Sequence, residues 1–369
     1  MYDCYVASGY ASPESDVEFG RSEVTGALGD SITVLPIVVS LALLTPLSLS
    51  HTLVAFGAFQ ILWGVVYGIP LSVEPMKALA GLAIAGTISL GELVAAGLLA
   101  GVVLLVAGRT GLVGVIERVV GVPVVRGIQL AVGLLLVVTG IELAAGNPIV
   151  ALAAVSVVAV VTLAGHRDAS TLVVMGLGGV AAAAIAGIPT PALPELTAFA
   201  GGGPSFTRGA LEGAAAQLAM TVGNAAVATA LLCSDLFDRD VSADRLAESM
   251  GAMTLAAVPM GGLPMCHGSG GLAGKHAFGA RTGGANVILG VGYLGLALVA
   301  GVVVAFPLAV LGVLLCVVGV ELARVALRSD DRLLTVGVGV LGVVANVGLA
   351  FVVGAVLDGL LRKTDVRGE

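Results

Sequence analysis

The sequence predicts an all-helical integral membrane protein with about fourteen transmembrane segments, arranged as two inverted repeats of seven spans. Three observations predict this fold: an apolar composition, a series of apolar runs separated by helix breakers, and a resemblance between the two halves of the chain. Of the 369 residues, 58% are hydrophobic and 11% are charged, whereas a soluble domain carries about 25% charged residues. The 54 glycines favour close helix packing in lipid.

The remaining composition excludes several classes of protein. Residues 1–25 are polar and acidic and lack the basic start and apolar run of a signal peptide, so we expect a cytoplasmic tail. The four cysteines are scattered without CxxC spacing, which predicts neither a disulfide framework nor a metal site. The net charge of −7 gives no nucleic-acid footprint. No cofactor is expected.

Apolar runs between breakers give the candidate spans, in chain order. They are 26–47, 51–67, 70–88, 91–107, 124–144, 148–164, 169–188, 209–236, 243–259, 265–280, 284–303, 305–326, 332–346 and 347–361. With the N-terminus inside, every basic residue beyond residue 26 falls on the cytoplasmic side except Lys77 and Arg208, as the positive-inside rule requires. We therefore expect a multi-pass protein of the cytoplasmic membrane with both termini in the cytoplasm.

Two short motifs recur at one offset and indicate an internal repeat. Gly-Asp at 29–30 returns as Gly-Asn at 223–224, and Gly-Ile-Pro at 68–70 returns as Gly-Leu-Pro at 262–264, an offset of 194 in both cases (223 − 29 and 262 − 68). Seven spans per repeat is an odd number, so the two halves would lie in the membrane with opposite orientations, as in many secondary transporters.

A longer match supports the repeat at a second offset. Residues 132–144 align with residues 311–323 at an offset of 179, with eight of thirteen positions identical. The two offsets differ by fifteen residues, which an amphipathic segment at 108–122 explains because it has no counterpart in the second half.

The chemistry concentrates at two breaks that the repeat makes equivalent. Residues 259–284 turn an apolar sequence glycine-rich, polar and basic, and residues 67–80 hold the matching Gly-x-Pro break. Proline favours an extended preceding residue and removes a backbone donor. We expect two short half-helices in spans 3 and 10 that begin near mid-membrane and face each other, which would form an anion site because helix N-termini carry free amides and partial positive charge.

The candidate substrate contacts lie around these two helix starts. They are Ser72, Val73, Glu74, Cys266, His267, Gly268, Ser269, Gly270 and Gly271. The serines supply hydroxyl donors and the glycines expose main-chain amides. Structural roles compete with this interpretation: a buried histidine is more often hydrogen-bonded within the core than bound to ligand, and a buried cysteine is more often a small packed residue than a nucleophile.

Five further residues are expected to support the site or couple it to transport. Lys77 would sit deep in the bilayer, where an unpaired charge costs about 2.5–3.5 kcal/mol, so it would pair with Glu74 at i, i+3 or take part in function, or both. Asp30 and Asn224 occupy equivalent positions and would brace the half-helices or reach the substrate. Lys275 and Arg281 would mark the cytoplasmic end of the second half-helix, where snorkelling is the default interpretation.

Four segments together resemble the molybdate transporter family, distant relatives of the SulP sulfate permeases. They are VEPMKALAGLAIAG (73–86), VPVVRGIQLAVGLLL (122–136), GLPMCHGSGGLAGKHAFGARTGG (262–284) and FPLAVLGVLLCVVGVELA (306–323). The resemblance implies a 7+7 inverted-repeat fold shared with nucleobase permeases, with an oxyanion held between spans 3 and 10. It further implies a core domain (26–107 and 209–303), a gate domain (108–188 and 305–361) and, by analogy alone, a homodimer. No soluble regulatory domain is expected after the last span.

One departure from the family bears on mechanism. Glu74 stands where the family usually has glutamine, and a carboxylate beside a divalent anion is repulsive unless it is protonated or paired. We expect protonation of Glu74 to accompany anion binding, with a proton as the coupling ion.

The leading hypothesis is a secondary transporter of molybdate, sulfate or tungstate, all tetrahedral dianions. The alternatives are a nucleobase or bicarbonate carrier of the same fold, a passive anion channel, and an intramembrane enzyme that uses Cys266, His267 and Arg281.

Overall fold

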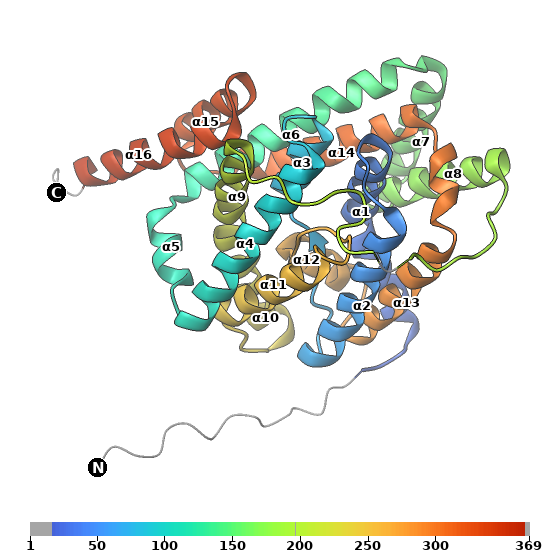
Figure 1. Cartoon of the computed structure of the whole chain (residues 1–369), viewed down its shortest axis with the longest axis horizontal. Coiled ribbons are helices and arrows are strands. Elements are labelled where there is room, and N and C mark those ends of the chain that lie inside the picture. Colours follow the sequence, from blue (N-terminus) through green and yellow to red (C-terminus); the bar gives the residue numbers. More distant parts are fainter. Residues whose placement is uncertain (1–16, 196, 366–369) are drawn as a thin grey trace, which may run out of the picture.

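The computed structural model describes residues 17–195 and 197–365, in which helices follow one another with few other elements (Figure 1). The first half contains α1 (Arg21–Leu44), α2 (Leu49–Tyr67), β1 (Glu74–Pro75), α3 (Lys77–Ile84), α4 (Leu90–Thr110), α5 (Val113–Val119), α6 (Val122–Ala145), α7 (Pro148–Leu163) and α8 (Arg167–Ala186). The second half contains α9 (Arg208–Met220), η1 (Thr221–Val227), α10 (Ala228–Phe237), α11 (Ala243–Ala257), β2 (Met265–Cys266), α12 (Ser269–Ala277), α13 (Gly284–Leu298), η2 (Ala300–Ala305), α14 (Leu308–Ala326), α15 (Arg332–Val344) and α16 (Val347–Asp365).

Seven helical segments of the described chain are long and apolar enough to cross a membrane. They are α1, α2, α4, α6, α14, residues Ala169–Ala186 of α8, and the continuous stretch Arg208–Phe237 that joins α9, η1 and α10. The chain is therefore an integral multi-pass membrane protein. A helix lies in each of the fourteen predicted ranges, but the other ranges hold helices that are shorter or less apolar, so the count of fourteen crossings stays a prediction.

Two boundaries differ from the sequence prediction. Residues 1–16 of the expected tail lie outside the described residues, but α1 already begins at Arg21, so the tail does not reach residue 25. Glu23 is buried and accepts hydrogen bonds from the amides of Arg281 and Ala285, at 2.8 and 3.2 Å. The predicted span at 209–236 contains a seven-residue π-helix, η1, in its middle, a feature that is frequent at functional sites.

The helix contacts are exchanged between the two halves, as a repeat related by a two-fold axis requires. An offset of 194 places α2 on α11, α3 on α12 and α4 on α13. In the structure α2 packs against α13 and α4 against α11, and these two contacts are equivalent under the repeat. Likewise α1 packs on α12 while α3 packs on α9. Each half-helix is therefore held by the first helix of the other half.

Helices α6 and α14 lie side by side and join the two halves through glycine (Figure 1). A Cβ added to Gly133 would lie 2.7 Å from the carbonyl oxygen of Gly319, and one added to Gly319 would lie 2.5 Å from that of Gly133. Gly140 and Gly312 face each other in the same way, at 2.6 and 2.5 Å. Real Cβ atoms do not approach this closely, so the helix spacing depends on these glycines.

The two breaks meet in a short antiparallel ladder between β1 and β2. Glu74 pairs with Cys266 and Pro75 with Met265, and the amide of Met76 donates to the carbonyl oxygen of Pro264 at 2.9 Å. The extended backbone at this depth is satisfied by its repeat partner, which is the condition for irregular backbone inside a membrane protein. The ladder sets the starts of α3 and α12 close together, as the sequence predicted.

Candidate functional site

A small cavity of about 40 Å³ lies between the start of α12, the start of α3 and the π-helical segment η1. Its lining residues are Glu74, Lys77, Gln217, Met220, Thr221, Asn224, Ala225, Cys266, Gly268, Ser269 and Gly270. The first backbone hydrogen bond of α12 runs from the amide of Leu272 to the carbonyl oxygen of Gly268. The amides of residues 269–271 are consequently not used within the helix, and they carry its partial positive charge.

Each half-helix is anchored by its serine to the first helix of its own half. Ser72 Oγ donates to Asp30 Oδ1 at 2.6 Å, and Ser269 Oγ donates to Asn224 Oδ1 at 3.2 Å. Asp30 and Asn224 are equivalent at the offset of 194, whereas the same offset places Ser72 on Cys266 and not on Ser269 (72 + 194 = 266). Both acceptors hold a segment that leads into a half-helix, which is compatible with the bracing role that the sequence suggested. Of the four residues, Ser269 and Asn224 line the cavity, whereas Ser72 and Asp30 are fully buried behind it.

A carboxylate of the chain itself lies at the start of α12. Glu74 is fully buried, forms an ion pair with Lys77, and accepts a hydrogen bond from Ser72 Oγ at 3.1 Å. A Cβ on Gly268 or Gly271 would overlap the Glu74 carboxylate. These two glycines therefore let the carboxylate approach the positive end of the helix, where anions are stabilised.

The start of α3 is capped in a different way. Gln217, on α9, accepts hydrogen bonds through Oε1 from the amides of Ala78 and Leu79, at 2.9 and 3.3 Å. Its Nε2 donates to Thr221 Oγ1 at 2.8 Å. Sequence reasoning gave Gln217 no role at this helix start, although a glutamine inside an apolar helix was a signal. The amides of Ala78 and Leu79 at the start of α3 are thus partnered, while Ser269 and Gly270 in the first turn of α12 line the cavity.

Lys275 does not snorkel to the cytoplasmic surface. It is fully buried, and its Nζ lies 3.0 Å from Asp30 Oδ2, 2.7 Å from Asn286 Oδ1 and 3.1 Å from Gln60 Oε1. The apolar neighbours of α12 leave the ammonium no path to water, so the chain supplies a carboxylate and two amide oxygens instead. Gln60 and Asn286 were missed, although each is a polar residue within an apolar run.

Three other predicted residues belong to the framework. His267 Nδ1 lies 2.9 Å from the carbonyl oxygen of Ser72, and its Nε2 lies 2.8 Å from Ser249 Oγ, so both ring nitrogens are partnered. Val73 is buried and its carbonyl oxygen accepts from Gln60. The Arg281 guanidinium donates to the carbonyl oxygens of His276 and Ala280, and the residue is exposed. Arg281 is thus not brought together with Cys266 and His267.

Comparison with known proteins identifies the family. The family described as "Molybdate transporter of MFS superfamily" matches residues 22–136 and 209–322, stretches that begin with the first helix of each half. Molybdate transporter 2 of Arabidopsis thaliana is 32% identical over 92% of this chain and 87% of its own. Molybdate transporter 1 of the same plant is 32% identical over 84% of this chain and 81% of its own. The chain belongs to the molybdate transporter family. It is therefore a membrane transporter of anions and not an enzyme.

Solved structures of other anion transporters share the fold of this molybdate transporter family member. The transmembrane domain of a cyanobacterial bicarbonate transporter, BicA, superposes with a TM-score of 0.62 at 16% identity, covering 91% of this chain and 96% of that one. Murine Slc26a9 superposes with a TM-score of 0.68 at 13% identity, covering 94% of this chain and 69% of that one. At such identities the likeness concerns the fold alone.

The predicted contacts divide into two groups around the cavity. Of the nine candidate substrate residues, the cavity is lined by Glu74, Cys266, Gly268, Ser269 and Gly270. The other four, Ser72, Val73, His267 and Gly271, lie outside its lining. Lining residues outside the predicted set of contacts come from α9 and η1, namely Gln217, Met220, Thr221 and Ala225. They follow no motif, and only the packing of α9 on α3 brings them to the site.

Proposed function

We propose that this protein is a secondary active transporter of a tetrahedral oxyanion, with molybdate as the first candidate and sulfate and tungstate as the others. The anion binds in the cavity at the start of α12 and crosses the membrane by alternating access. The observation that carries the proposal is that the Ser269 hydroxyl, the Lys77 ammonium and first-turn amides that α12 does not use meet at one cavity. These groups are the donors that a compact oxyanion requires.

The size of the cavity supports a compact ion. A buried water needs roughly 10–15 Å³ of such volume, so a cavity of about 40 Å³ holds about three waters. A nucleobase ring would require a larger opening, whereas a four-oxygen ion is close to this scale.

Charge balance supports coupling to protons. Asp30 pairs with Lys275, and Glu74 pairs with Lys77, so the buried ionic groups compensate one another. A dianion in the cavity would add two negative charges next to the Glu74 carboxylate, at a large desolvation cost. Protonation of Glu74 removes one charge and frees Lys77 for the anion. One proton is therefore taken up and transported with each anion.

The wider arrangement is proposed from the same family resemblance. Residues 26–107 and 209–303 form a core domain that carries the site, and residues 108–188 and 305–361 form a gate domain against which it moves. The protein resides in the cytoplasmic membrane with both termini in the cytoplasm and assembles as a homodimer.

Binding of molybdate, sulfate and tungstate to the purified full chain tests the site. Lys77→Met and Ser269→Ala should each weaken molybdate binding, Lys77→Met by roughly tenfold to a hundredfold because a hydrogen bond to a charged group is worth about 1.5–3 kcal/mol. Arg208→Met and Ser156→Ala are the matched controls, because both residues lie outside the cavity lining. Tight binding that survives both cavity substitutions would refute the site.

Uptake into proteoliposomes at several pH values tests the coupling. In the wild type, uptake should fall as the pH rises, because the anion then meets a deprotonated Glu74. Glu74→Gln removes the titrating group, so its uptake should vary little with pH. Equal pH dependence in the two proteins would refute proton coupling through Glu74, and failure to accumulate the anion against its gradient would indicate a channel.

A further inference from the structure

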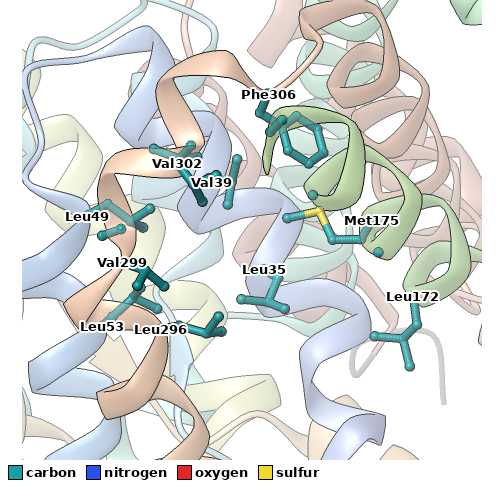
Figure 2. Close-up of a pocket in the computed structure, with 15 residues that line it drawn as sticks. Leu35, Val39, Leu49, Leu53, Leu172, Met175, Leu296, Val299, Val302 and Phe306 are labelled. Carbon is teal, nitrogen blue, oxygen red and sulfur yellow. The ribbon is translucent and has the colours of Figure 1, made fainter. Parts of the chain in front are cut away.

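A second cavity, of about 300 Å³, lies between α1, α2, α8 and α13 (Figure 2). We call it the apolar groove. Its lining residues are Leu35, Val39, Leu49, Leu53, Leu172, Met175, Gly176, Gly179, Ala182, Leu296, Val299, Ala300, Val302, Val303 and Phe306. None of these side chains is polar, and none of these residues lines the anion cavity.

The walls come from helices that belong to different parts of the fold. Helices α1, α2 and α13 form one side, α8 forms the other, and η2 with Phe306 closes one end (Figure 2). Leu296 on the rim is 46% exposed, so the groove opens to the outside of the bundle. In an integral membrane protein that outside is the hydrocarbon of the bilayer.

We propose that the apolar groove binds an acyl chain of a bilayer lipid. Its lining offers no hydrogen-bond partner to water, and apolar cavities of this kind stay dry. An empty groove would forfeit dispersion contacts along both walls, and a hydrocarbon chain restores them without desolvating any polar group. The occupant is a hydrocarbon because every side chain that faces it is apolar.

The length of the groove matches one leaflet. The lining residues of α8 run from Leu172 to Ala182, and ten residues of α-helix rise about 15 Å. The hydrocarbon core of a bilayer is about 30 Å thick, so this distance is about half of it. A single acyl chain of one leaflet therefore fits along α8.

Glycine keeps the groove open on the α8 side. A Cβ added to Gly176 or Gly179 would meet no atom within 4 Å. Gly178, on the next face of the helix, instead packs against the Phe306 ring, where a Cβ would overlap it. Larger residues at positions 176 and 179 would enter the groove and exclude a chain without disturbing the packing of α8.

The other half shows that the groove is not imposed by the repeat. The offset of 179 makes α16 the counterpart of α8. Helix α16 packs directly on α9, and a Cβ on Gly348 would overlap the Glu212 side chain there. Helix α8 also contacts α1, and the apolar groove lies alongside that contact.

Native mass spectrometry of the full chain, purified from vesicles of a palmitoyl-oleoyl phospholipid, tests the proposal. The wild type should retain one phospholipid per protomer under detergent washing, and Gly179→Leu and Gly176→Leu should retain at least threefold less. Gly337→Leu is the matched control, because Gly337 is exposed on α15 and its added Cβ would also meet no atom within 4 Å. It should retain lipid as the wild type does.

Three results would overturn the proposal: no retained phospholipid on the wild type, equal retention in all the variants, or equal loss in Gly337→Leu. Thermal unfolding shows whether each variant is folded. If one of the two groove variants does not fold, the other still tests the proposal. Molybdate binding should be unchanged throughout, because the two cavities share no residue. Loss of lipid with intact anion binding therefore tests the apolar groove independently of the proposed function.

Discussion

The starts of α3 and α12 are repeat equivalents, yet their first turns have different hydrogen-bond partners and different surroundings. At α3 the first-turn amides are capped by Gln217, and the serine before the helix donates to a carboxylate, Asp30. At α12 the first turn is mostly glycine, its amides face the cavity, and Ser269 donates to the amide oxygen of Asn224. The repeat thus supplies one framework twice. The first half carries the buried carboxylates Asp30 and Glu74, and the second half presents the open helix start together with the buried ammonium of Lys275.

The largest effect is expected from breaking the buried ion pair between Lys275 of α12 and Asp30 of α1. Lys275→Met leaves Asp30 buried without its cation, which should lower the free energy of unfolding by about 3–5 kcal/mol. Adding Asp30→Asn makes position 30 resemble position 224 and should recover most of that loss. Thermal unfolding in detergent measures both. If the double variant is no more stable than Lys275→Met alone, Asp30 is not the partner that matters.

An intermediate effect is expected from adding a methyl group where the start of α12 contacts the first half. Gly271→Ala places a methyl group among the oxygens of Asp30, Ser72 and Glu74, so overpacking should cost about 1–3 kcal/mol. Gly270→Ala is the matched control for stability, because its Cβ would meet no atom within 4 Å. Equal unfolding temperatures for the two variants would show that the start of α12 can retreat from the first half.

A similar or smaller effect is expected from removing the cap on α3. Gln217→Ala leaves the amides of Ala78 and Leu79 without an acceptor, which should cost about 1–3 kcal/mol. Gln217→Glu keeps an acceptor oxygen and should cost less in stability, but it adds a negative charge to the cavity and should weaken molybdate binding. Unfolding and binding measured on the same preparations separate the two effects. Stability unchanged in Gln217→Ala would mean that another group caps α3.

The positions of the helices and of the two half-helix starts could be predicted from the sequence, because local chemistry determines them. Apolar runs placed the helices, and the Gly-x-Pro breaks at 68–70 and 262–264 placed the two half-helix starts. The pairing of Glu74 with Lys77 followed from their spacing of three residues on one chain segment. Each of these features depends on neighbours in sequence or on the repeat itself.

The rest of the site depends on contacts between distant elements. The burial of Lys275 requires Gln60 and Asn286, which lie on α2 and α13, and no local pattern links the three. The cap on α3 comes from Gln217, more than a hundred residues further along the chain. The apolar groove has no motif, because ordinary lipid-facing side chains form it.

The ladder between β1 and β2 constrains the order of assembly. Glu74 leaves the ribosome 192 residues before its partner Cys266 (266 − 74). During that interval the extended segment of the first half lacks the strand that satisfies it at membrane depth. The proposed anion site therefore cannot form until the second half has been made as far as residue 266, and a chain interrupted before that residue would lack it.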